Sequence, residues 1–146
     1  MARRLVWALD LVLIANGAVM LALPAWWYEI VPGVADTGPF NPHFIRDIGA
    51  AYVVAGGGLV WFLLDRAARP AALLGCAFLS LHALIHLWDW AAGRESLVHL
   101  LRDVPTVIVP GLLIFSLARR VTSTSRENRY AEPADAAADR RLRTGL

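Results

Sequence analysis

Four apolar runs, each close to the length of a membrane-spanning helix, take up most of this 146-residue sequence. An α-helix rises about 1.5 Å per residue, so about 20 apolar residues are needed to cross the hydrocarbon core of a bilayer. The runs cover residues 5–23, 42–64, 71–92 and 97–118. They predict an all-α fold, a bundle of four transmembrane helices. The 58% hydrophobic content and the mean hydropathy of +0.51 agree with this prediction.

Charge and cysteine content exclude two classes of protein. All 14 basic residues are arginine, and no basic cluster with interleaved aromatic residues falls on a soluble helix, so we expect no nucleic-acid binding. Cys76 is the single cysteine and lies inside an apolar run. The chain therefore forms no internal disulfide, and the paired-cysteine chemistry of membrane thiol oxidoreductases is not expected.

The first run also fits a cleavable signal peptide, because Arg3 and Arg4 precede it. Asp10 interrupts the apolar core, however, and Pro24 would stand at the cleavage junction. We therefore favour a helix that is retained. Asp10 lies near the inner end of that helix, where we expect it to reach the interface or to cap the helix.

Capping residues mark where the later helices begin. Asn41 and Pro42 favour a helix start, with the asparagine as N-cap and the proline at the first helical position. Ser96 is the expected cap of the fourth helix. After residue 120 the composition turns to Thr, Ser, Ala, Arg and Asp, which is typical of a mobile tail. We therefore expect a transmembrane domain at residues 1–120 and a disordered cytoplasmic tail at 121–146.

Glycine and proline inside the runs predict local features of the helices. Residues 56–58 are three glycines, which favour a close crossing between helices in lipid. Pro105 and Pro110 are expected to kink the fourth helix, because proline cannot donate the helical hydrogen bond.

The arginine distribution predicts the orientation in the membrane. Arginines flank the runs at the N-terminus, at residues 65–70 and at 119–120, whereas the connection at 29–40 has none. Because loops rich in arginine stay in the cytoplasm, we expect a multi-pass protein with both termini cytoplasmic.

Ionisable residues from three of the runs share one layer near the outer side of the bilayer in this topology. Charged groups in lipid are costly, so they should turn inward and form a polar or ligand-binding cluster. The motif His-x-x-Arg-Asp occurs at residues 43–47 and again at 99–103, which predicts two helical hairpins related by a pseudo-twofold axis. The predicted cluster consists of His43, Arg46, Asp47, Asp89, Arg102 and Asp103. We expect it to contain two pairs between the second and fourth helices, Arg46 with Asp103 and Arg102 with Asp47.

The histidines suggest a metal or haem site. His82, His86 and Asp89 stand at i, i+4 and i+7, so they share one helix face. Two histidines at i and i+4 can bind one metal ion, with Asp89 as a further ligand or as a partner of a ligand. Haem would need ligands from opposing helices, such as His86 with His43 or His99. The candidate metal ligands are His82, His86 and His99.

Several interpretations of these residues stay open. The cluster can serve only as hydrogen-bonding groups between helices, it can hold haem or a transition metal, or it can bind a proton, a quinone or a small solute. The first function class is therefore an accessory or small-ligand-binding membrane protein. The alternative is a metal- or haem-binding redox protein that uses His82 and His86 with His43 or His99. The bilayer is the expected partner, with a larger membrane complex or a homo-oligomer as further expectations.

The segment Gly-Pro-Phe-Asn-Pro-His-Phe-Ile-Arg-Asp-Ile-Gly at residues 38–49, followed by the His82-x-x-x-His86 span, resembles bacterial four-span proteins of the DoxX-like kind. The resemblance covers residues 5–118 and implies a small four-helix protein of the bacterial inner membrane. Some DoxX-like proteins are linked to quinone-coupled sulfur redox chemistry, but this chain has no cysteine pair. The matching positions are Asn41, His43, Arg46, Asp47, Gly49, His82 and His86.

Overall fold

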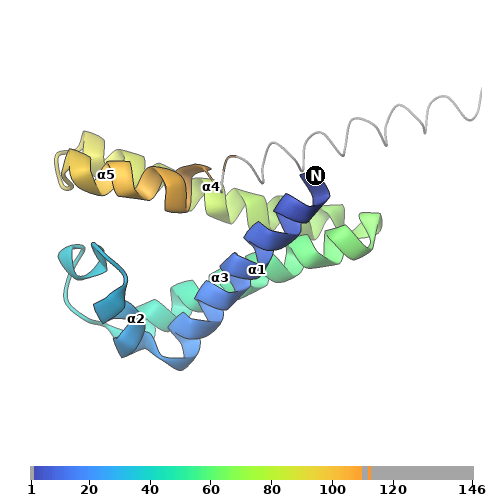
Figure 1. Ribbon diagram of the computed structural model, residues 1–146, viewed down its shortest axis with the longest axis horizontal. Helices are drawn as coiled ribbons and strands as arrows, with labels where there is room; N and C mark the ends of the chain where they lie inside the picture. Colours follow the sequence, from blue (N-terminus) through green and yellow to red (C-terminus); the bar gives the residue numbers. More distant parts are fainter. Residues whose placement is uncertain (1, 110–111, 113–146) are drawn as a thin grey trace, which may run out of the picture. The chain divides into compact units, whose positions relative to one another are not determined.

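The computed structural model describes residues 2–109 and 112, all within one unit, Met1–Phe115. Every regular element in these residues is helical, as predicted (Figure 1). In chain order the elements are α1 (Ala2–Ala22), α2 (Pro24–Ile30), the 3-10 helix η1 (Val34–Asp36), α3 (Pro42–Leu64), the 3-10 helix η2 (Arg66–Ala68), α4 (Arg69–Ala91), α5 (Leu97–Asp103) and the π-helix η3 (Val104–Ile108).

The predicted helix starts are confirmed by their capping bonds. Asn41 Oδ1 accepts hydrogen bonds from two backbone N–H groups in the first turn of α3, each at 3.1 Å, and Pro42 is the first residue of that helix. The Ser96 hydroxyl accepts in the same way from the backbone N–H of His99, at 3.3 Å. These bonds satisfy N–H groups that have no partner inside the first turn of a helix.

Helix α3 packs against α1 and against α4, and glycines make both contacts close (Figure 1). A Cβ atom placed on Gly49 would lie 2.7 Å from the Met20 Cβ atom of α1. One placed on Gly58 would lie 2.8 Å from the Ala71 carbonyl oxygen of α4. The helix backbones therefore approach to distances that leave no room for a side chain, as in small-residue interfaces between membrane helices. The close crossing predicted from residues 56–58 is confirmed.

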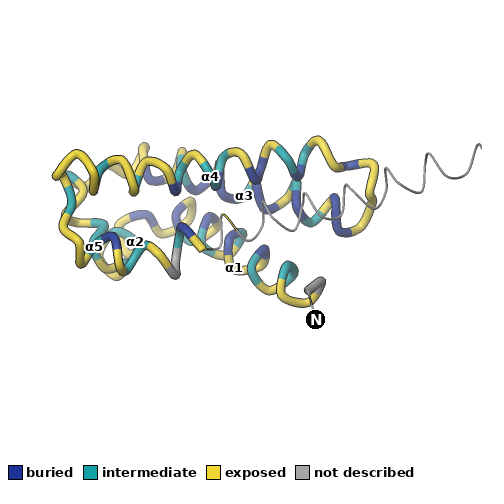
Figure 2. Tube along the Cα trace, turned by 90° about the horizontal axis from the view of Figure 1, so that it is seen from above, coloured by how far each residue is buried: buried dark blue, intermediate teal, exposed yellow. Residues whose placement is uncertain are grey.

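The outward sides of the long helices are apolar and exposed (Figure 2). Leu11, Val54 and Leu74 expose 68%, 75% and 74% of their surface. A large exposed apolar surface on a helix of this length is suited to contact with lipid chains. Within the described residues, three helices are long and apolar enough to cross a bilayer, and they identify a membrane protein. These spans are Arg4–Ala22, Pro42–Leu64 and Arg66–Ala91.

The chain after Ser96 turns back along α4. Ala83 of α4 packs with Leu100 and Ile108 in a buried apolar cluster, which holds α5 and η3 on α4. In this segment the helix widens to a π-helix, in which the Val109 N–H donates to the Val104 carbonyl oxygen. Pro105 lies in the widened turn, where its missing N–H would interrupt regular α-helical bonding.

Some predictions concern residues that the structure does not describe. Pro110, most of the C-terminal half of the predicted fourth span and the tail at 121–146 lie outside the described residues. The fourth span and the pseudo-twofold axis therefore stay predictions. Residues 24–40 contain two helical elements that were not predicted, α2, which begins at Pro24, and η1.

Two adjacent glycines of α3 provide a test of this packing. Gly58→Ala should lower the thermal stability of the purified protein by about 1–3 kcal/mol, since the added Cβ would lie 2.8 Å from a backbone oxygen of α4. Gly57→Ala is the matched control, because a Cβ there meets no atom within 4 Å. Thermal unfolding in one detergent, followed by circular dichroism, compares the two. Equal melting temperatures would contradict the close α3–α4 contact.

Candidate functional site

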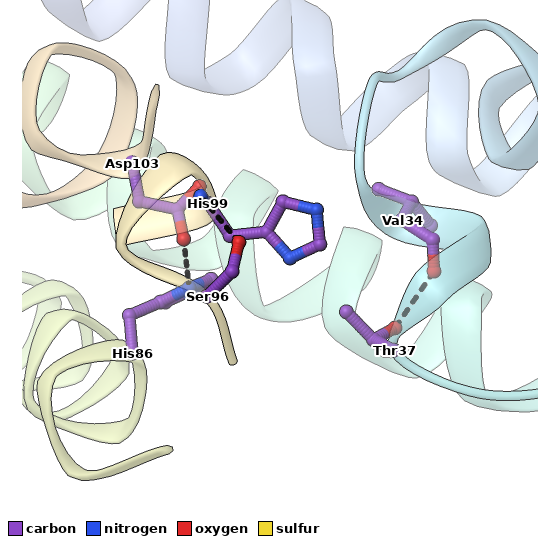
Figure 3. Close-up of polar contacts among 6 residues, drawn as sticks. All are labelled: Val34, Thr37, His86, Ser96, His99 and Asp103. Atoms are coloured by element: carbon purple, nitrogen blue, oxygen red, sulfur yellow. Dashed lines mark hydrogen bonds and ion pairs between the residues drawn. The ribbon is translucent and has the colours of Figure 1, made fainter. Parts of the chain in front are cut away.

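A polar site lies between α4 and α5, on the side of the connection that joins them. His86 Nδ1 of α4 and Asp103 Oδ2 of α5 are 2.7 Å apart, and about one fifth of each side chain is exposed (Figure 3). The short connection between the helices brings them together. Gly93 adopts a left-handed φ of 71°, which a glycine takes without strain, and Ser96 then caps α5. The reversal places α5 beside α4, so Asp103 meets a residue of the preceding helix.

Glu95, in the same connection, completes this site. Its side chain is half-buried, and its Oε2 atom is buried with no hydrogen-bond partner among the described residues. One ligand atom from each of His86, Glu95 and Asp103 lies within 4.8 Å of the other two. These three residues are called the α4–α5 site below. Sequence analysis did not name Glu95 as a site residue. Its position just before Ser96, the cap residue of α5, indicates that it lies beside the ends of both α4 and α5.

His82 lies next to the α4–α5 site, within an aromatic stack. Its ring centroid is 4.9 Å from that of His86, in an edge-to-face arrangement that agrees with their i, i+4 spacing. The other neighbours of the His82 ring are Phe78, stacked at 6.0 Å, and Tyr52, edge-on at 5.7 Å. His82 is thus held by aromatic packing between α3 and α4.

His99 and Arg102 contact the first connection instead. His99 Nε2 lies 3.2 Å from Asp36 Oδ2, and its ring points toward η1, away from His86 (Figure 3). The Arg102 guanidinium lies against Gly33, where an added Cβ would be only 2.8 Å from an Arg102 nitrogen. Gly33 also has a positive φ of 90°, so glycine suits this position for two reasons. His99 and Arg102 therefore join α5 to η1 and to the residue just before it.

The remaining predicted cluster residues lie apart from the α4–α5 site. His43 and Asp47 contact each other at 3.4 Å, and their side chains are 87% and 62% exposed. Arg46 Nε donates to the carbonyl oxygen of Leu21, at 3.2 Å. Arg46 and Asp103 were predicted to pair, but each has a different partner in the structure.

Asp89 was considered as a metal ligand, but it forms an ion pair in the connection after α4. Its Oδ1 atom lies 2.8 Å from Arg94 NH1. Both residues lie close in the chain to Glu95, yet the contact of Asp89 is with arginine. Asp89 is thus placed outside the set of donor atoms that gather around His86.

The two copies of His-x-x-Arg-Asp make different contacts. His43 and Asp47 of the first copy pair with each other at the surface of α3. His99 and Asp103 of the second copy have partners on η1 and on α4. The same short motif therefore serves in one place as an exposed pair and in the other as a link among three segments.

Asp10 differs from the sequence prediction. It was expected to reach the interface or cap α1, but it is fully buried, and neither carboxyl oxygen has a hydrogen-bond partner among residues 2–109 and 112. It lies beside Gly56 of α3, where a built Cβ would be 3.1 Å from Asp10 Oδ1. The missing side chain of the glycine makes room for the carboxyl group.

The α4–α5 site can bind a cation or a ligand with hydrogen-bond donors. It offers an imidazole and two carboxylates, and one carboxylate oxygen is buried without a partner. It is poorly suited to haem, because His82 and His86 follow each other on one helix and His99 points elsewhere (Figure 3). Comparisons with protein-family models, curated proteins and solved structures find no match to this chain.

The hydrogen bond between His86 and Asp103 should matter for stability. Asp103→Ala would leave His86 half-buried without this partner, so we expect a loss of about 1–3 kcal/mol in thermal unfolding. Asp47→Ala is the matched control. It removes an exposed carboxylate whose contact is with His43, and should change stability by less than about 0.5 kcal/mol. A larger loss for Asp47→Ala than for Asp103→Ala would contradict this assignment.

Proposed function

We propose that the protein is a small integral membrane protein that binds a small ligand at the α4–α5 site. The observation that carries this proposal is the buried Oε2 atom of Glu95, which has no partner among the described residues although Asp103 is close by. A buried polar group without a partner lowers stability, as does a second carboxylate nearby. A cluster that served only to join helices would not need Glu95. A ligand that donates hydrogen bonds or carries positive charge would satisfy it.

A role as an accessory protein whose polar groups only organise the helices is the second candidate. It is favoured by the contacts of His86 with Asp103 and of His99 with Asp36, each of which joins two separate elements. Both contacts are also compatible with the first proposal, because they position the segments around the α4–α5 site. Glu95 distinguishes the two candidates.

For the membrane arrangement we propose a four-span protein of the bacterial inner membrane with both termini in the cytoplasm. The arginines at 3–4, 66–69 and 119–120 support this orientation, and the resemblance to DoxX-like proteins supports the membrane and the number of spans. The α4–α5 site would then face the outer side. A pseudo-twofold relation between two hairpins, and assembly into a larger complex or a homo-oligomer, belong to the same proposal.

Glu95→Gln tests the ligand-binding function. The neutral amide removes repulsion with Asp103, so the melting temperature of the ligand-free protein should rise by about 2–4 °C, equivalent to about 1 kcal/mol. Asp47→Asn makes the same change at an exposed position and should have no measurable effect. A lower melting temperature for Glu95→Gln would mean that Glu95 stabilises the fold, and would favour the accessory role.

A further inference from the structure

We propose that the ligand of the α4–α5 site is a divalent transition-metal ion, bound by His86, Glu95 and Asp103. This inference rests on the proposed ligand-binding function and names the chemistry of the ligand. It is carried by two separate observations. Three donor atoms of a suitable kind already lie within 4.8 Å of one another, and one carboxylate oxygen of the set is buried with no partner among the described residues.

The distances suit a metal ion after a local rearrangement of side chains. Donor atoms at about 2.0–2.2 Å from one tetrahedral ion lie about 3.5 Å apart. Separations of up to 4.8 Å therefore need to close by about 1 Å. Rotation of the Glu95 side chain can supply this, because Glu95 lies in the connection between α4 and α5 rather than within a helix. The 2.7 Å hydrogen bond between His86 and Asp103 would open as both groups turn toward the ion, and its proton would be released.

The kinds of donor atom indicate the class of metal. One imidazole nitrogen and two carboxylates favour ions such as Zn²⁺, Mn²⁺ or Fe²⁺. Cu⁺ prefers thiolate or thioether ligands, and the single cysteine, Cys76, is buried elsewhere on α4. Ca²⁺ takes six to eight oxygen ligands, whereas this set has an imidazole in the place of an oxygen. Three protein ligands also leave coordination positions for water or for a further ligand.

Charge favours a metal over a neutral ligand. Glu95 and Asp103 bring two acidic groups to one half-buried place. Arg94, next to Glu95 in the chain, pairs with Asp89. A divalent cation would balance both carboxylates at once and would satisfy the buried Glu95 oxygen, which a neutral hydrogen-bond donor would do only in part.

The test measures metal binding by the full-length, tag-free protein in detergent. Protein treated with a chelator is mixed with ZnCl₂, MnCl₂ or MgCl₂, desalted, and its metal content measured by elemental analysis, with affinity from calorimetry. We expect about one Zn²⁺ or Mn²⁺ to be retained per chain and no Mg²⁺. Glu95→Gln should weaken Zn²⁺ binding at least tenfold.

Matched variants exclude binding at the exposed His43–Asp47 pair of α3, which is one of two further places in the described residues where a histidine meets an aspartate. His43→Gln and Asp47→Asn should leave Zn²⁺ affinity within twofold, whereas His86→Gln should reduce it as Glu95→Gln does. Circular dichroism and size-exclusion chromatography establish that each variant is folded. Binding lost in His43→Gln but retained in Glu95→Gln would overturn the proposed metal site.

Different results would overturn the metal proposal and the ligand-binding proposal. In one outcome the unmodified protein retains neither Zn²⁺ nor Mn²⁺, while metal-free Glu95→Gln is more stable than the unmodified protein. This outcome overturns the proposal that the ligand is a metal ion, and the site must then bind a different ligand. If metal-free Glu95→Gln is less stable, Glu95 belongs to the fold and the ligand site itself is overturned. Retained metal that depends on both Glu95 and His86 supports both proposals.

Discussion

The close approach of α3 to its two neighbours is the contact on which the rest of the fold depends. Lipid chains are as apolar as the helix surfaces, so burial of apolar side chains does little to hold membrane helices together. Close packing must replace it. The glycines at 49 and 58 let α1 and α4 reach the α3 backbone, and many large apolar side chains are left on the outside, where lipid chains can cover them. α4 placed in this way then supports α5.

A second constraint acts on the polar residues. Each ionisable group in an apolar environment needs a partner, because a group left alone loses its hydration without compensation. Among the described residues, the structure supplies partners for three of them: Asp103 for His86, Asp36 for His99 and Arg94 for Asp89. Glu95 and Asp10 depart from this rule. Unpartnered groups of this kind reduce stability and have no evident structural role, so they are the first candidates for a functional site.

The two departures differ in what surrounds them. Asp10 of α1 is fully buried and lies beside Gly56 of α3. Glu95 lies among other donor groups, in the connection of a helical hairpin. The surroundings of Glu95 suit a binding site, because several groups of suitable chemistry converge on one point.

The sequence by itself determined the membrane character, the helical class and the starts of α3 and α5, because length, hydropathy and capping are local properties of the chain. It also named His86 and Asp103, though with other partners. Only the tertiary structure decided that these two meet each other, that Glu95 joins them and that His82 and His99 do not. Spacing along a helix defines which residues share a face. It does not define how far each helix is rotated toward its neighbours, or where a short connection places its side chains, and those two quantities decide which polar groups touch.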